Sequence, residues 1–120
     1  MSLRRKQLGQ KGESVAERFL QSKGYQTVAR NVRSRHGEID LIAMDGDTLV
    51  FVEVRTRSGF AYGTPTESVT WRKRRKLQEL ALAYLQNCSQ PVKHFRFDVI
   101  GIVYVPAALQ PRIDHIIHAF

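Results

Sequence analysis

Two segments carry apolar residues at helical spacing, and each is predicted to form an amphipathic helix. The first spans about residues 6–23 and stops before Gly24, although Gly9 and Gly12 weaken its first turns. The second spans about residues 71–88, with Thr70 as N-cap and Pro91 beyond its end. The apolar faces hold Leu8, Val15, Ala16, Phe19 and Leu20 in the first helix, and Leu77, Leu80, Ala81, Tyr84, Leu85 and Cys88 in the second.

The other apolar runs are short, rich in β-forming residues and bounded by turn residues, which is typical of strands. They span about residues 25–32, 38–44, 48–55, 95–104 and 113–117, with residues 58–65 as a loop. Gly101 is expected to interrupt the fourth run. The order α-β-β-β-α-β-β predicts an α/β fold in which helices flank a mixed β-sheet, as a single domain over residues 1–120.

The second and third strands are predicted to form a hairpin that places two carboxylates on one face. If the turn is Asp45-Gly46, or a four-residue loop with the same centre, Asp40 pairs with Phe51. Asp40 and Glu53 are then diagonal neighbours, with Cβ atoms somewhat less than ~7–8 Å apart. A three-residue loop would instead place them on opposite faces.

Two neighbouring carboxylates among Ile, Val and Phe residues repel each other, and burying them is costly unless a cation lies between them. Mg²⁺ or Mn²⁺ suits such a site, since Mg²⁺ prefers oxygen ligands and can polarise a phosphodiester. Glu13 flanks the apolar stripe of the first helix and could reach the site, while Lys73 could contact a phosphate beside it. Spacing alone leaves alternatives open: Glu53 could pair with Arg55, Glu13 could be an exposed carboxylate, and Lys73 could lie along the core edge.

The distribution of charge along the chain indicates the class of binding partner. Nineteen Lys and Arg residues oppose eleven Asp and Glu, and the formal net charge is +8. The excess lies between residues 4 and 35 and in the run 72–76, and such clusters attract polyanions, with nucleic acid as the favoured partner and DNA before RNA. An acidic protein or an anionic membrane surface is the alternative. The residues expected to contact nucleic acid are Arg30, Arg33, Arg35, Arg57, Arg72, Lys73, Arg74, Arg75 and Lys76.

Other features narrow the class of protein. No segment approaches the roughly 20 apolar residues of a membrane span, and the basic N-terminus lacks the apolar run of a signal peptide, so a cytoplasmic protein is expected. Cys88 is the only cysteine and cannot form an internal disulfide. His115 and His118 would lie on opposite faces of a strand, which favours packing or surface roles over metal binding.

Several motifs together resemble a known family. Asp40, a turn, and then Glu53-Val54-Arg55 resemble the PD-(D/E)XK signature of restriction-endonuclease-like nucleases. More closely, blocks spanning nearly the whole chain resemble the YraN-like family of uncharacterised small bacterial proteins. These blocks are Gly9-x-x-Gly12-Glu13 with Ala16; Gly24-Tyr25; Arg30-Asn31; Gly37-Glu38-Ile39-Asp40-Leu41-Ile42; Phe51-Val52-Glu53-Val54-Arg55-Thr56-Arg57; Lys73; Arg96-Phe97-Asp98-Val99; and Ala119-Phe120.

The resemblance implies a version of the fold like that of Holliday-junction resolvases, which act as dimers, so a homodimer is one expectation. By position it implies Glu13, Asp40 and Glu53 as ligands of Mg²⁺ or Mn²⁺, with the Val54 carbonyl as a further oxygen. It also implies catalytic roles for Asp40, Glu53 and Arg55. Arg55 stands where the pattern has lysine, and arginine cannot act as a base near neutral pH, although it could clamp a phosphate.

Three functions are therefore weighed. The first is a metal-dependent endonuclease or junction-resolvase-like enzyme that cleaves phosphodiester bonds, as an Mg²⁺-dependent endodeoxyribonuclease would. The second is a catalytically impaired nucleic-acid-binding module on the same fold, for which Arg55 is the clue. The third is an assembly protein whose basic face meets an acidic partner. The set of Glu13, Asp40 and Glu53 favours the first over the second, and the basic clusters disfavour the third.

Overall fold

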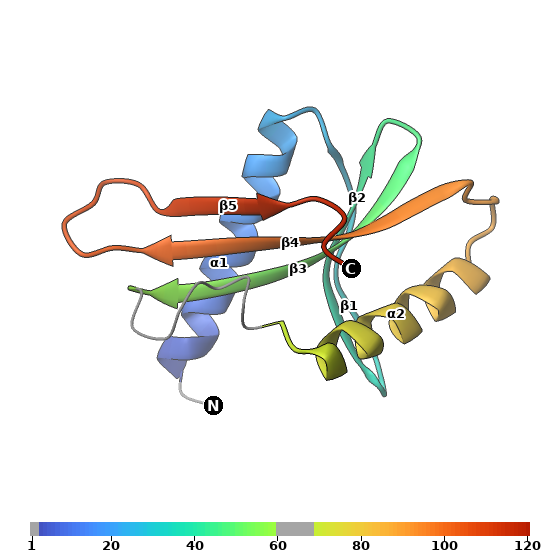
Figure 1. The fold of residues 1–120 in the computed structure, drawn as a ribbon, viewed down its shortest axis with the longest axis horizontal. Coiled ribbons are helices and arrows are strands. Elements are labelled where there is room, and N and C mark those ends of the chain that lie inside the picture. The colour runs from blue at the N-terminus through green and yellow to red at the C-terminus, as the bar shows by residue number, and fades with distance from the viewer. Residues whose placement is uncertain (1–2, 60–68) are drawn as a thin grey trace.

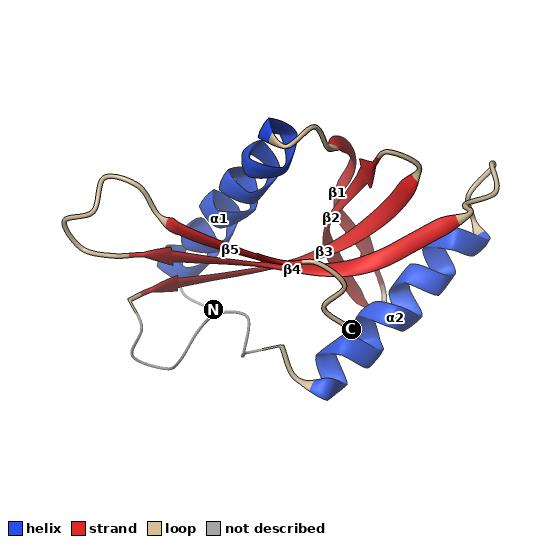
Figure 2. Ribbon diagram, turned by 45° about the horizontal axis from the view of Figure 1, so that its top comes forward, coloured by secondary structure: helices blue, strands red, loops and turns tan. Residues whose placement is uncertain are grey.

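Two helices cover opposite faces of one five-stranded sheet in the computed structural model, which describes residues 3–59 and 69–120, with side chains from residue 6 onward (Figures 1 and 2). The helices are α1 (Leu3–Ser22) and α2 (Trp71–Gln86). The strands are β1 (Gln26–Ser34), β2 (Gly37–Asp45), β3 (Thr48–Ser58), β4 (His94–Tyr104) and β5 (Arg112–Ile116). This order confirms the predicted α-β-β-β-α-β-β arrangement. Residues 60–65 of the predicted loop lie outside the described residues.

The strands lie side by side in chain order, β1 to β5. All neighbours are antiparallel except β3 and β4, which run parallel because α2 carries the chain from one to the other. The predicted break at Gly101 is wrong: Gly101 is buried within β4, opposite Arg55 on one side and Asp114 on the other. The sheet therefore continues without interruption past the Glu53 position.

Each face of the sheet has its own apolar core. On one face, Ala16 and Leu20 of α1 pack with buried residues of the sheet, namely Leu41, Ala43, Val50, Val52, Val54, Ile100 and Ile102. On the other face, Leu80 and Ala81 of α2 pack over Ile39, Ile42, Leu49, Phe51 and Phe97. Apolar residues of β2 and β3 thus serve both cores, which explains why these strands read as near-continuous apolar runs. Within the described chain, no helix has the length and apolar character to cross a membrane.

The β2–β3 turn lies one residue later than predicted. Asp45 pairs with Thr48, so the loop is Gly46-Asp47, and Gly46 takes a positive φ of 60°. A two-residue hairpin loop needs a positive φ, and glycine adopts it without a steric penalty. The expected pairing of Asp40 with Phe51 is therefore wrong by two residues. A shift of two leaves most side chains on their predicted faces, although Ile39 packs with Ile42 beneath α2 while Leu41 packs beneath α1.

Candidate functional site

Asp40 and Glu53 meet where β2 and β3 separate. The ladder between β2 and β3 ends at the pair of Leu41 and Val52, and Asp40 and Glu53 are the first residues beyond it. Asp40 Oδ2 accepts a hydrogen bond from the Val54 backbone N–H at 2.9 Å, and the neighbouring Glu53 carboxyl is close enough to raise the pKa of Asp40. Glu53 is only 3% exposed. The two carboxyl groups predicted to converge thus interact at the end of the ladder.

Two further carboxylates join Asp40 on its other side. One oxygen each of Glu13, Glu38 and Asp40 lies within 4.8 Å of the others. The Asn31 side-chain amide, with its nitrogen turned toward the carboxylates, donates to Glu13 at 2.8 Å and to Glu38 at 2.6 Å. Glu13 is half-buried, so the alternative of a fully exposed helix carboxylate is wrong.

Close packing of α1 on β3 positions Glu13. A Cβ at Gly12 would overlap the Thr56 hydroxyl, so only glycine allows the helix backbone to approach the strand this closely. Glu13 follows directly and lines a small depression with Arg30, Asn31 and Asp40. Gly9, by contrast, has open space around it. Of the two glycines in the motif, Gly12 is the one required by the packing.

The crowded carboxylates hold protons more tightly than usual. Burial, together with the neighbouring Asp40 and Glu38 charges, raises the pKa of Glu13 to about 7. Burial and the hydrogen bond and charge of Glu53 raise the pKa of Asp40 to about 8. The Val54 N–H and the Lys73 ammonium oppose this rise without cancelling it. The positive charges near the site therefore do not neutralise its carboxylates.

Lys73 supplies a cation from the opposite side of the cluster. It lies in the first turn of α2, where its backbone N–H is capped by the Thr70 hydroxyl at 3.2 Å. Its Nζ atom lies 3.5 Å from Glu53 Oε2, and that oxygen has no hydrogen-bond partner among the described residues. Lys73 therefore lies beside Glu53, and its contact with a phosphate stays a prediction.

Arg55 and Val54 follow Glu53 on β3. Arg55 is half-buried and shares the face of Glu53 by strand alternation. Val54 packs in the core beneath α1, and its N–H binds Asp40. A role for the Val54 carbonyl as a metal ligand stays a prediction.

The basic residues expected to contact nucleic acid fall into two groups. Residues 72–76 lie at the start of α2, where four of the five side chains are exposed and Lys73 faces Glu53. On β1, Arg30 pairs with Glu17 at 2.6 Å and Arg33 with Glu38 at 3.8 Å. Arg35 is exposed beside the β1–β2 turn, and Arg57 is half-buried near the end of β3. Glu17, the partner of Arg30, is mostly covered by its contacts with Arg30 and Thr27.

Sequence reasoning missed Glu38 and Asn31 as members of the cluster. A signal for Glu38 existed, because it precedes Asp40 by two residues on the same strand and so projects to the same side. The contribution of Asn31 depends on its positive φ of 50°, a conformation that asparagine tolerates better than most residues but that no pattern reveals.

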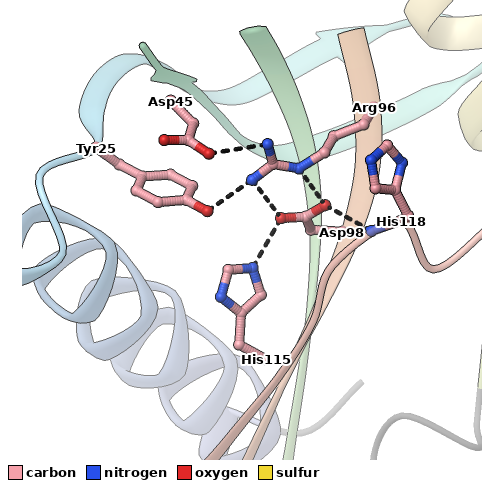
Figure 3. Close-up of polar contacts among 6 residues, drawn as sticks. All are labelled: Tyr25, Asp45, Arg96, Asp98, His115 and His118. Atoms are coloured by element: carbon pink, nitrogen blue, oxygen red, sulfur yellow. Dashed lines mark hydrogen bonds and ion pairs between the residues drawn. The ribbon is translucent and has the colours of Figure 1, made fainter.

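A second polar network, also missed, lies inside the sheet away from this cluster. Asp98 is fully buried and accepts hydrogen bonds from Arg96 at 3.0 Å and from the His118 backbone N–H at 3.2 Å, with the His115 ring 2.7 Å away (Figure 3). Arg96 also donates to Asp45 and to the Tyr25 hydroxyl (Figure 3). The contacts to Asp45, His115 and the His118 backbone join β4 to β2, to β5 and to the C-terminal segment, which indicates a structural role.

Comparisons with known proteins place the chain among relatives of similar length. Residues 12–102 match the model of the uncharacterised protein family UPF0102. The UPF0102 protein of Rhodococcus opacus is 48% identical over 94% of this chain and 95% of its own. The UPF0102 protein STH1475 of Symbiobacterium thermophilum is 52% identical over 81% and 82%, and that of Geobacter metallireducens is 46% identical over 100% and 97%. The resemblance to small, uncharacterised bacterial proteins is confirmed, and the chain belongs to the UPF0102 family.

Proposed function

We propose that this chain is a metal-dependent endonuclease that cleaves phosphodiester bonds in nucleic acid. The observation that carries the proposal is the meeting of Asp40 and Glu53 carboxyls, with Glu13 on one side and the Lys73 ammonium on the other. Neighbouring carboxylates repel one another and destabilise the fold unless protons or a cation neutralise them. Raised carboxyl pKa values of this kind cluster at functional sites.

The residues present fit Mg²⁺ or Mn²⁺. The cluster offers only oxygen donors, it is short of positive charge, and Glu53 Oε2 is buried without a hydrogen bond among the described residues. Glu13, Glu38 and Asp40, whose oxygens lie within 4.8 Å of one another, would hold the ion, and Glu53 beside Asp40 would be a further oxygen donor. Bound there, a divalent ion would supply Lewis-acid polarisation of a phosphodiester and lower the pKa of water.

The chain's own cations would handle the phosphate. Lys73 lies at the edge of the cluster on an exposed helix end, and Arg55 follows Glu53 on the same strand face. Either can bind a phosphate oxygen and stabilise the negative charge that develops during cleavage. The exposed start of α2 extends this positive surface, and a net charge of +8 favours a polyanionic substrate.

The test is cleavage of single-stranded, duplex and branched DNA with Mg²⁺ or Mn²⁺. We expect cleavage by the wild-type protein and a loss of at least about 100-fold in the Asp40→Asn and Glu53→Gln variants, an effect of the size seen when a catalytic group is removed. The Leu82→Ala variant, altered at an exposed position of α2, serves as control. A variant lacking the Asp40 carboxylate that cuts as fast as wild type would refute the proposal.

The alternative is a nucleic-acid-binding module whose catalysis is impaired by arginine at position 55. Arginine stays charged, whereas lysine can shift its pKa and help position the attacking water. Salt-dependent binding without cleavage by the wild-type protein, together with cleavage by an Arg55→Lys variant, would favour this alternative over the enzyme.

A further inference from the structure

Trp71 is the only tryptophan of the chain, and its side chain lies in the open. It is 71% exposed as the first residue of α2, directly after the Thr70 cap. Burying a tryptophan releases a large apolar area from water, so one left this exposed is unusual. Its position is held by the helix and not by a loop, which keeps the ring at a defined place on the surface.

Cations and a second aromatic ring surround Trp71. The Arg75 guanidinium lies over the indole, 5.5 Å from its centroid, and the Arg74 guanidinium lies 5.7 Å from the Phe120 ring. These four residues and Gln78 line a depression of about 300 Å³. Phe120 is in turn stacked on Phe97 of β4, with ring centroids 5.1 Å apart, so the Phe120 side of the depression packs against the sheet.

This chemistry suits a nucleotide better than an acidic protein segment. A flat ring bordered by guanidinium groups can stack on a base while the cations meet the adjoining phosphates. The only acidic neighbour that the described contacts show is Glu79, which pairs with Arg75 at 3.7 Å. A base in a regular duplex has both faces covered by its neighbours, and only an unpaired base can present one to Trp71.

The platform and the acidic cluster both meet the first turn of α2, on different sides of the helix. Trp71 and Lys73 are two residues apart, so their Cα atoms are separated by roughly 5–6 Å, and Lys73 Nζ lies 3.5 Å from Glu53. A strand whose unpaired base rests on Trp71 would carry its neighbouring phosphates toward Lys73. Recognition and the proposed chemistry would then use opposite sides of one helix end.

We propose that Trp71, Arg74, Arg75 and Phe120 form a stacking platform for an unpaired base, which makes nucleic acid with single-stranded nucleotides the substrate class. The inference rests on the proposed function for what happens after binding. Binding itself can be measured without cleavage, in EDTA.

Because Trp71 is the sole tryptophan, its intrinsic fluorescence reports on the platform directly. The experiment titrates the protein in EDTA with three DNA probes of equal phosphate number: a single strand, a blunt duplex, and a duplex with a single-stranded overhang. We expect the single strand and the overhang to quench the fluorescence strongly and the blunt duplex to leave most of it. Because the Trp71 variants lack this signal, affinities are compared by fluorescence anisotropy of dye-labelled probes. A Trp71→Ala variant should lose roughly 5- to 150-fold in affinity for the single strand and less than twofold for the blunt duplex.

Matched variants separate stacking from charge and from folding. Trp71→Phe keeps a ring and should retain most of the affinity for the single strand. Leu82→Ala, at another exposed apolar position of α2, should leave the affinity for both probes unchanged. Arg74→Ala should lower the affinity for both the single strand and the blunt duplex and reduce the salt dependence of binding. Circular dichroism checks that each variant is folded, which is expected because the altered side chains are exposed.

The results distinguish failure of this inference from failure of the proposed function. Equal loss of affinity for the single strand and the blunt duplex in Trp71→Ala, or unchanged fluorescence of the wild-type protein with every probe, would overturn the platform even if the protein cleaves DNA. Selective quenching and selective loss would support it even if no metal ion produces cleavage.

Discussion

Asp40 meets carboxylates on more than one side. Glu13 and Glu38 lie near one oxygen, and the neighbouring Glu53 carboxyl is close enough to raise the pKa of Asp40. The Val54 N–H and the Lys73 charge favour its ionised form. A residue held in this way lowers the stability of the metal-free protein near neutral pH, and this cost is what a bound cation would remove.

The pH dependence of stability should reveal this cost. Folding raises the pKa of Asp40 to about 8 from an unfolded value of about 3.9, so between these values the folded state retains a proton that the unfolded chain has released. The free energy of unfolding in EDTA should therefore fall as the pH rises through this window. Asp40→Asn should flatten the dependence and be about 0.5–2 kcal/mol more stable than wild type at pH 8. Urea unfolding at a series of pH values measures both, and a less stable variant at pH 8 would contradict the account.

Divalent ions should stabilise the wild-type protein through the same residue. A ligand that binds only the folded state adds RT ln(1 + [L]/Kd), about 2.7 kcal/mol at a hundred times Kd. For a domain of this size we expect Mn²⁺ at that level to raise Tm by roughly 5 °C or more at pH 8. The Asp40→Asn and Glu53→Gln variants should show little rise. Differential scanning calorimetry supplies the measurement, and equal rises in all three proteins would place the ion elsewhere.

At the scale of elements, the approach of α1 to β3 sets the position of Glu13. The helix crosses the strand at Gly12, where the Thr56 side chain leaves no room for a Cβ. The helix then places Glu13 near Asp40 and Glu38. A small change in helix position would therefore move one carboxylate relative to the other three.

The two glycines of α1 offer a matched pair of substitutions. Gly12→Ala forces a methyl group against Thr56 and should cost about 1–3 kcal/mol of stability, as overpacking does. It should also weaken Mn²⁺ binding by displacing Glu13. Gly9→Ala meets nothing within 4 Å and should stabilise the helix by about 0.5–1 kcal/mol, with Mn²⁺ binding unchanged. Thermal unfolding and Mn²⁺ titration decide the point; similar effects of the two substitutions would show that the close contact is unimportant.

The hairpin shows which parts of the site a sequence can predict. Strand alternation alone puts Asp40 and Glu53 on one face, and an error of two residues in register does not change that. The separation of the two carboxyls depends on register, which the position of Gly46 in the turn decides. The Asn31 contacts depend on a backbone conformation, and such features escape pattern reasoning.

Across the whole molecule, helix and strand order follows from periodicity, whereas the links between distant segments do not. Both helices and all five strands lie close to their predicted ranges, because long amphipathic patterns and β-rich runs are strong signals. The Asp98 network joins β4 to β5, to the C-terminal segment and, through Arg96, to Tyr25 and Asp45. No pattern in the sequence indicates that Tyr25, Asp45 and His115 meet Arg96 and Asp98.

Asp98 should therefore be among the most costly residues to replace. Burial opposes its ionisation, but hydrogen bonds from His115 and Arg96 outweigh that effect and keep its pKa below the usual value. Asp98→Ala would leave the Arg96 charge buried without its main partner and should cost about 3–5 kcal/mol. Asp114→Ala, which removes a more exposed carboxylate paired with Arg112 on β5, should cost no more than about 1 kcal/mol.

Acid unfolding also tests the role of Asp98, whose contribution to the pH dependence of stability has the opposite sign to that of Asp40. Because the pKa of Asp98 is lowered on folding, its contribution to stability is fully present above the unfolded value of about 3.9 and is lost as the pH falls through the lower folded value. The wild-type protein should lose stability steeply below about pH 4, and Asp114→Ala should follow the same curve. If Asp98→Ala is folded at pH 6, its stability should fall less steeply in acid; a curve parallel to wild type would mean that other carboxylates govern acid unfolding.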